Sequence, residues 1–279
     1  MTGIFTAIKD IAKSIEDKVF SNYDDFIKAD KSNEDVNKDI NKFCEDLITK
    51  QFSAVENIKS IVSQDTKEIV TINENGKYIV TYVSIDNIEL LDLNFSLGTI
   101  FAIYENEICG ANLVASSYVT YGPTFQLVFA TKDDGVDFYS FDGVDFVEQD
   151  HFTLEKKGKI NSTAGDVTTF DDAHKSLMKN FFDEGYRLRF SNSLALDTHQ
   201  ILFKRGGLYS SPSTKIDPNG TLDLAFEAYP ISFIIELAGG EAIDGSNRIL
   251  DIELKGDISK KTPIYFGSTQ EISEVKKKI

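Results

Sequence analysis

Residues 219–245 read NGTLDLAFEAYPISFIIELAGGEAIDG, and this stretch organises the C-terminal third of the chain. Asn-Gly is a turn signal, and the apolar-rich run after it predicts a helix over residues 222–238. The pair Gly239-Gly240 marks the end of that helix, because glycine tolerates the conformations found after a last helical turn. Downstream, residues 262–268 (TPIYFGS) predict a strand, and residues 270–278 (QEISEVKKK) predict a short helix with cations in its last turn.

The rest of the chain carries both helical and strand patterns. Further amphipathic helices are predicted over residues 4–20, 35–53, 171–183 and 193–204. The polar segment 28–35 reads as a loop between the first two helices, and Gly206-Gly207 follows the last. Residues 69–149 instead hold short apolar runs separated by NENG, KDDG and DG turns, which predict strands and hairpins. Mixed helices and strands, with no internal repeat or linker, favour a layered α/β or α+β fold.

Composition excludes several classes of function. The 279 residues carry a formal charge of −16, which disfavours nucleic acid and anionic membranes as partners because both require a cationic surface. The charge also disfavours a polyanionic substrate unless local cations or metals reverse the field. Two cysteines make no disulfide framework or zinc motif, and residues 1–20 resemble neither a signal peptide nor a membrane span. The sequence therefore predicts a cytoplasmic globular protein.

Several motifs resemble those of class 1 fructose-1,6-bisphosphatases. The stretch 219–245 is similar to the family segment that runs NGKLRLLYE, then NP, then a helix ending in AGG. Residues 189–213, RFSNSLALDTHQILFKRGGLYSSPS, resemble the family's RY pair, helix and GG strand. Residues 82–104 correspond to its DPLDGSSN stretch and GTIF strand, and residues 58–65 to the strand that ends in Ser-Glu-Glu. The matches are collinear from about residue 34 onward.

The resemblance implies a fold, an ancestry and an assembly. The fold would be the five-layer αβαβα sugar-phosphatase arrangement, with an N-terminal half over 1–155 that carries the metal-site motifs and a sugar-phosphate-binding half over 156–279. The ancestral activity would be Mg²⁺-dependent hydrolysis of fructose 1,6-bisphosphate to fructose 6-phosphate in gluconeogenesis. The assembly would be a homotetramer, or a mixed oligomer with an active paralogue.

Some of the family's metal positions keep an oxygen ligand. Such a phosphatase uses clustered carboxylates to hold Mg²⁺, which bridges the phosphate and activates water. Carried over residue by residue, the resemblance places retained acidic ligands at Asp65, Asp86 and Glu227. Ile85 can still offer its backbone carbonyl, and the aspartate of the family's early Gly-Asp pair corresponds to Asp35.

Other positions lose the ligand. The first of the two family glutamates is Gln64, which keeps an oxygen without its charge. The first aspartate of DPLDGS is Val83, which cannot bind a metal. The aspartate that the resemblance makes part of the catalytic base is Asn41, and an amide cannot take a proton from water at neutral pH.

The phosphate-binding motifs are altered too. The family's Gly-Ser-Ser cradle for the 1-phosphate is replaced by Asn87, Ile88 and Glu89, and a carboxylate there would repel a phosphate dianion. In the loop KGKINSTAGD, Ala164 occupies the position of a phosphate-binding asparagine. The sequence DEGY at 183–186 resembles the family's Asn-Glu-Gly-Tyr but lies beyond the following helix, so we treat it as coincidence.

The sugar-binding positions follow the same trend. The lysine of NGKLR is Thr221, and the arginine two residues later is Asp223. A tyrosine of the GG strand is Ser211. The RY pair keeps its arginine as Arg189, whereas its tyrosine is Phe190 and lacks the hydroxyl.

Two hypotheses remain open from the sequence. In the first, the chain is a pseudoenzyme with a regulatory or partner-subunit role. In the second, it is an active, divergent Mg²⁺-dependent sugar phosphatase that still binds a sugar phosphate. His151, His174 and His199 have no Ser or Cys motif with which to form a triad, so we predict that all three are structural or exposed. Framework motifs persist while site motifs decay together, which favours the pseudoenzyme.

Overall fold

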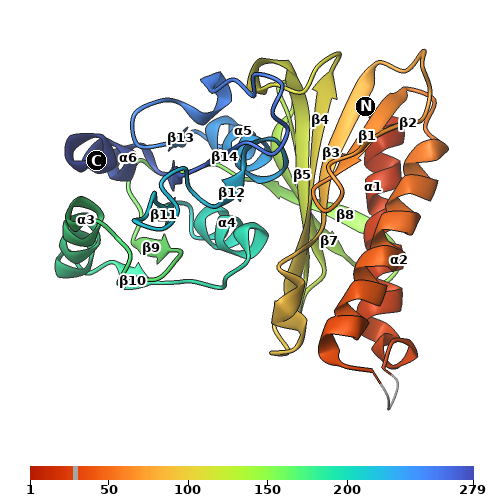
Figure 1. Cartoon of the computed structure of the whole chain (residues 1–279), viewed down its shortest axis with the longest axis horizontal. Helices are drawn as coiled ribbons and strands as arrows, with labels where there is room; N and C mark the ends of the chain where they lie inside the picture. The colour runs from red at the N-terminus through yellow and green to blue at the C-terminus, as the bar shows by residue number, and fades with distance from the viewer. Residues whose placement is uncertain (28–30) are drawn as a thin grey trace.

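The computed structural model describes residues 1–27 and 31–279 and arranges them in five layers (Figure 1). Two N-terminal helices cover one face of a large sheet, and two inner helices separate that sheet from a smaller one. The small sheet carries two further helices on its outer face. These pairs, from the N-terminal side, are α1 (Thr2–Ile15) with α2 (Asn33–Ser53), α4 (Leu194–Phe203) with α5 (Tyr229–Leu237), and α3 (Asp172–Asp183) with α6 (Thr269–Lys278). The predicted five-layer αβαβα fold is confirmed.

The large sheet has eight strands in the order β2-β1-β3-β4-β5-β6-β7-β8. Their bounds are β1 (Ile58–Ser63), β2 (Ile69–Thr71), β3 (Tyr78–Asp86), β4 (Leu97–Glu105), β5 (Leu113–Tyr121), β6 (Gln126–Thr131), β7 (Gly135–Phe141) and β8 (Phe146–His151). Only the β1–β3 pair is parallel among these described strands. The strands and hairpins predicted over residues 69–149 are therefore confirmed, with β1 added in front of them.

The small sheet has the order β10-β9-β11-β15-β13. Its bounds are β9 (Ile160–Thr163), β10 (Arg187–Leu188), β11 (Leu208–Ser211), β13 (Glu241–Ile243) and β15 (Ile264–Gly267). A separate two-stranded ribbon pairs β12 (Leu222–Asp223) with β14 (Lys261–Thr262). Gly207 joins α4 to β11, and a Cβ there would lie 2.6 Å from the Ile160 carbonyl oxygen, so the close approach requires glycine.

Three apolar cores hold the layers together. Ile8, Ile40 and Phe101 belong to the core between the N-terminal helices and the large sheet. A second core joins the two sheets through the inner helices, and a third lies under α3 and α6. Strand β4 is buried along its length, apart from partly exposed Glu105, because cores press on both of its faces.

Three predicted element boundaries need correction. The helix predicted over residues 222–238 begins only at Tyr229: Leu222–Asp223 is strand β12, and Leu224–Ala228 forms a π-helical turn. Pro230 explains the late start, because proline suits the first turn of an α-helix but not its interior. The helix predicted over residues 4–20 is α-helical to Ile15 and continues as a π-helical turn, Glu16–Ser21. The predicted loop 28–35 falls partly outside the described residues, and α2 already starts at Asn33.

The histidines are structural or exposed, as predicted. His174 and His199 are enclosed, and burial lowers the pKa of each to about 4. His199 Nδ1 lies 3.0 Å from the Tyr118 hydroxyl, and its ring packs against Phe138 and Phe203. His151 is exposed. None of the helices in the described part of the chain is long and apolar enough to cross a membrane.

Candidate active-site cleft

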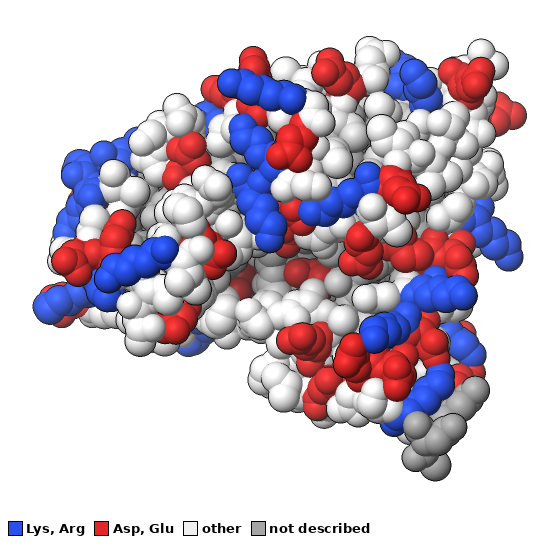
Figure 2. Space-filling model, in the orientation of Figure 1, with Lys and Arg blue, Asp and Glu red and all other residues white. Residues whose placement is uncertain are grey.

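A cleft of about 420 Å³ opens where the ends of β1 and β3 meet the loops around β11 and β12. Figure 2 shows a hollow at the centre of this face with acidic atoms on its floor. The structure brings eight of the predicted site residues into the lining of this cleft: Gln64, Asp86, Asn87, Ala164, Phe190, Ser211, Thr221 and Glu227. Chain segments more than 150 residues apart in the sequence therefore contribute to one site.

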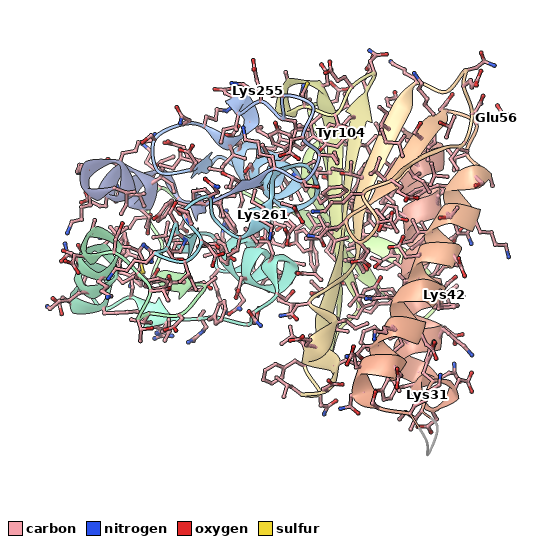
Figure 3. All side chains as sticks on the ribbon, in the orientation of Figure 1. Lys31, Lys42, Glu56, Tyr104, Lys255 and Lys261 are labelled. Atoms are coloured by element: carbon pink, nitrogen blue, oxygen red, sulfur yellow. The ribbon has the colours of Figure 1, made fainter. Side chains whose placement is uncertain are left out.

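Asp223 lies beside the cleft, next to the lining residue Leu222, in a network of protein donors. Gln64 Nε2 donates to Asp223 Oδ2 at 3.0 Å, and Lys67 Nζ donates to Asp223 Oδ1 at 2.9 Å. Asp223 is only 6% exposed, so its charge needs these partners. Its neighbour across the β12–β14 ribbon is Lys261, which is labelled near the centre of Figure 3. Asp223, which stands at the position of a family arginine, is thus compensated by the amide of Gln64 and the ammonium of Lys67.

Asp86 ends strand β3 and points at the start of α4. Its Oδ2 accepts hydrogen bonds from the Ser193 hydroxyl at 2.7 Å and from the Ala195 backbone N–H at 2.8 Å. Burial raises the pKa of the Asp86 carboxyl, although these hydrogen bonds act in the opposite direction. One of its oxygens is therefore committed to capping a helix, and the residue lies on the cleft floor.

Glu227 is positioned by the π-helical turn Leu224–Ala228. The hydroxyls of Thr81 and Tyr104 both donate to the Ala225 carbonyl, at 2.9 and 2.7 Å, which ties this turn to the large sheet. Tyr104 is labelled in Figure 3 at the junction between the sheet and the inner layer. Glu227 Oε2 accepts the Asp223 backbone N–H at 2.7 Å. Desolvation raises the Glu227 pKa to about 8, so its carboxyl is mostly protonated at neutral pH.

Asn87 preserves the backbone of the turn after β3. Its φ is +56° and its ψ is +71°, in the left-handed region that glycine adopts freely and that asparagine tolerates best among the other residues. Its Nδ2 donates to the Asn192 carbonyl at 2.8 Å and so links the turn to the segment before α4. Asparagine therefore keeps the shape of a family glycine but fills the space beside it.

The opposite wall of the cleft is built from small hydroxyl-bearing residues. Ser211 Oγ lies 3.1 Å from Thr221 Oγ1, so the two hydroxyls pair with each other. Ala164, whose N–H donates to the Ser210 carbonyl, lies beside them. Thr169 and Thr214 also face this space. Neutral hydroxyls at positions 211 and 221 and a methyl group at position 164 thus stand where the resemblance implies a tyrosine, a sugar-binding lysine and a phosphate-binding asparagine.

Three predicted site residues instead belong to the apolar cores. Val83 is buried in the core between the sheets, paired with Ile100 across β3 and β4. Ile85 is buried in the N-terminal core, and the partly buried Ile88 packs against the same core. None of these three lines the cleft. At position 83 the replacement adds to the packing of the core, and at position 88 the side chain faces away from the cleft.

Five other predicted site residues also lie outside the cleft lining. Asp35 caps α2: it forms a capping box with Ser32, whose hydrogen bonds lower the pKa of the exposed Asp35 carboxyl. Glu89 and Arg189 are exposed, and Arg189 Nη1 donates to the carbonyl of Leu188. Asp65 lies on the exposed turn after β1, and Asn41 on α2 has a buried Oδ1 without a partner among the described residues.

Sequence reasoning missed two residues, Glu45 and Lys67. Glu45 lies four residues after Asn41 on α2 and accepts hydrogen bonds from the Ser63 and Tyr82 hydroxyls at 2.7 and 2.8 Å. Burial raises the pKa of its carboxyl. The i to i+4 spacing could have identified Glu45. A buried acid in place of an arginine at position 223 could have prompted a search for a cation such as Lys67.

The residues present do not fit the divalent metals of such a phosphatase. Mg²⁺ requires several free, charged oxygen ligands. Here Asp86 Oδ2 is committed to α4, Glu227 Oε2 accepts the Asp223 backbone N–H, and Asp35, Asn41 and Asp65 lie outside the cleft lining. Val83 offers no oxygen from its side chain. Within residues 1–27 and 31–279, no three His, Cys, Asp or Glu side chains are grouped as a metal site.

Comparisons with known proteins cover almost the whole chain. Family models described as the N-terminal and C-terminal domains of fructose-1-6-bisphosphatase match residues 1–149 and 154–279. The class 1 fructose-1,6-bisphosphatase of Campylobacter hominis is 38% identical over 279 residues, covering 99% of this chain and 98% of the relative. The enzyme of the same name from Campylobacter jejuni strain RM1221 is 42% identical over 234 residues, covering 84% and 83%.

Solved structures extend the comparison of the fold. The holo form of Leishmania major fructose-1,6-bisphosphatase superposes with a TM-score of 0.88 at 23% identity, covering 98% of this chain and 92% of that one. A putative sedoheptulose-1,7 bisphosphatase from Toxoplasma gondii gives a TM-score of 0.86 at 22% identity, covering 99% and 93%. The likeness extends over both sheets and all three helical layers.

Proposed function

The chain belongs to the fructose-1,6-bisphosphatase family, and from that membership we propose that it is a member without effective metal-dependent hydrolysis of fructose 1,6-bisphosphate. It would act as a pseudoenzyme, either as a binding protein or as a regulatory subunit beside an active relative. The family relationship supplies the fold. The proposal concerns only the chemistry that the cleft can still perform.

The network around Asp223 carries this proposal. In an active site of this family, metals and cationic side chains must reverse the field for a substrate with about four negative charges. Here the side chains of Lys67 and Gln64 instead donate hydrogen bonds to Asp223. Each lost catalytic ligand or oriented donor typically costs about 2–4 kcal/mol of transition-state stabilisation, so two losses approach 10⁴-fold.

A subunit role draws support from one exposed loop. Leu93 and Phe95 follow the short helix after β3, and both side chains are largely exposed. Apolar side chains gathered in this way mark candidate contact surfaces. We therefore propose a homo-oligomer or a mixed oligomer, for which light scattering at micromolar concentration would show a mass above that of one chain.

The test is a gain of function. A variant that restores the family pattern should gain Mg²⁺-dependent hydrolysis of fructose 1,6-bisphosphate by at least about 100-fold, since each restored group contributes a few kcal/mol. Its substitutions, all at residues that line the cleft or contact its lining, are Gln64→Glu, Asn87→Gly, Thr221→Lys and Asp223→Arg. A variant with only Ile88→Ser and Glu89→Ser is the control, because neither side chain lines the cleft. Turnover by the wild type above about 1 per second would refute the proposal.

A further inference from the structure

We propose that a basic hollow beside the cleft holds the phosphate group of a sugar phosphate without a metal ion, while the sugar lies against the hydroxyl-bearing wall of the cleft. The hollow has a volume of about 730 Å³, and its lining includes Lys255, Lys260 and Lys261. This inference rests on the proposed function, because it assigns a ligand class to a binding protein whose family phosphate cradle is replaced. Three features support it: the position of the hollow, its charge and its fixed backbone.

The hollow adjoins the cleft along the chain at positions 216 and 217. Ile216 and Asp217 line both spaces, so one ligand can extend from the cleft into the hollow. The β12–β14 ribbon lies between them: Thr221, just before β12, lines the cleft, whereas Lys261 on β14 lines the hollow. In Figure 2, basic side chains gather along the upper edge of the cleft. A cationic site therefore borders the place where the sugar would lie.

The lysines of the hollow are available to an anion. Within residues 1–27 and 31–279, none of Lys255, Lys260 and Lys261 forms an ion pair with a carboxylate. Asp217 and Asp257 also line the hollow, so its lining carries three positive and two negative side chains. In a chain with a formal charge of −16, this local excess of positive charge favours an anion over a cation.

The backbone around the hollow is fixed before a ligand binds. The Leu224 N–H donates to the Lys260 carbonyl at 2.8 Å, which ties β14 to the turn after β12. A Cβ on Gly220 would lie 2.1 Å from the backbone nitrogen of Pro263, so the segment before β12 approaches the ribbon closely. Lys260 Nζ donates to the Glu253 carbonyl at 2.6 Å, so one ammonium is already oriented. Donors that are held in place lose less conformational entropy when an anion binds.

The donors of the two spaces suit a phosphate attached to a polyol. Ammonium groups bind phosphate oxygens through charge-assisted hydrogen bonds, and they need no divalent metal to do so. Asn219 and Ser259 also line the hollow and add neutral donors. In the cleft, the paired hydroxyls of Ser211 and Thr221 keep further capacity to donate to and accept from a sugar. The phosphate would thus bind outside the replaced cradle at positions 87–89.

Calorimetric titration of the full chain in the presence of EDTA tests the inference. The probes are ribose 5-phosphate, ribose and inorganic phosphate. We expect ribose 5-phosphate to bind at least about tenfold tighter than either of the other two, because it alone occupies both the hollow and the cleft. No binding of ribose 5-phosphate, binding no tighter than that of ribose or inorganic phosphate, or binding that requires Mg²⁺ would each overturn the inference.

A matched pair of variants locates the phosphate. Lys255→Gln with Lys261→Gln removes two charges from the hollow and should weaken ribose 5-phosphate binding about tenfold, while ribose binding stays unchanged. Lys42→Gln with Lys50→Gln removes two exposed charges from α2, where Figure 3 labels Lys42, and should leave both affinities unchanged. An unchanged affinity in the first variant, or an equal loss in the second, would contradict the assignment. Turnover of fructose 1,6-bisphosphate by the wild type in Mg²⁺ refutes the proposed function, whereas absent ribose 5-phosphate binding without turnover refutes only this inference.

Discussion

Strand β4 and the turn that precedes it are neighbours in the sequence, yet they have diverged from the family pattern to different degrees. Residues 97–105, LGTIFAIYE, keep the family's GTIF motif and are buried between two cores. Residues 83–89, VSIDNIE, keep only Asp86 of the family's charged and small residues. Burial constrains β4 whatever the protein does, because any change in volume there disturbs two layers. The turn was constrained by metal and phosphate, and it has acquired packing and internal hydrogen bonds instead.

The largest effect on stability is expected at Val83, a predicted site position that lies in the apolar core between the sheets. Val83→Asp would place a carboxylate in the apolar layer between the sheets, and we expect a loss of about 3–5 kcal/mol in unfolding free energy. Val83→Ala, which only removes methyl groups, should cost about 1–3 kcal/mol. Urea denaturation measures both. If Mg²⁺ restored the stability of Val83→Asp, the metal pocket would have survived the other replacements.

The ion pair beside the cleft should contribute more to stability than an ion pair on the surface. Lys67→Met leaves the buried Asp223 with Gln64 alone, and we expect a loss of about 1–3 kcal/mol, reduced from the fully buried case because Lys67 is partly exposed. Lys38→Met breaks the exposed pair with Glu34 and should change stability by no more than about 0.5 kcal/mol. Equal losses of stability in the two variants would show that the Asp223 network stabilises the fold no more than a surface ion pair does.

Lowering the pH from 7 to 5 should destabilise the fold through protonation of His199 in the unfolded state. Its pKa is about 4 in the folded chain and near 6.5 when unfolded, so the unfolded state binds more protons between these values. Stability from this residue is therefore present at pH 7 and falls by about 1–2 kcal/mol at pH 5. His199→Phe should remove that part of the slope in urea unfolding measured at the two pH values. An unchanged slope would mean that His199 is protonated in the fold.

The smallest effect on stability is expected at Asn87, in the turn after β3. Asn87→Gly loses the bond to the Asn192 carbonyl but relieves the left-handed backbone, so the net change should be within about 0.5 kcal/mol. Asn87→Ala loses the bond without relief and should cost about 1–2 kcal/mol. Thermal unfolding of both variants compares them. A marked loss on substitution by glycine would show that the side-chain bond, rather than the backbone shape, defines the turn.

The sequence predicted the layers well because apolar periodicity reports burial. Eight of the predicted site positions line one cleft, and their roles there stay predictions. The sequence could not place Ile88, because the direction of a side chain after a strand depends on which core receives it. It could not find the Lys67–Asp223 pair, whose members are 156 residues apart. The late start of α5 was missed because Leu222–Asp223 pairs with β14, a contact that helical periodicity does not encode.

The most direct test of the central claim is the steady-state turnover of fructose 1,6-bisphosphate by the wild-type chain in saturating Mg²⁺. A cleft that lacks the family's carboxylate at position 83 and its lysine at position 221 should give no turnover above the buffer control, or turnover at least about 10³-fold below the roughly 1 per second of ordinary enzymes. Turnover above about 1 per second would contradict the claim and show that metal and substrate still bind productively.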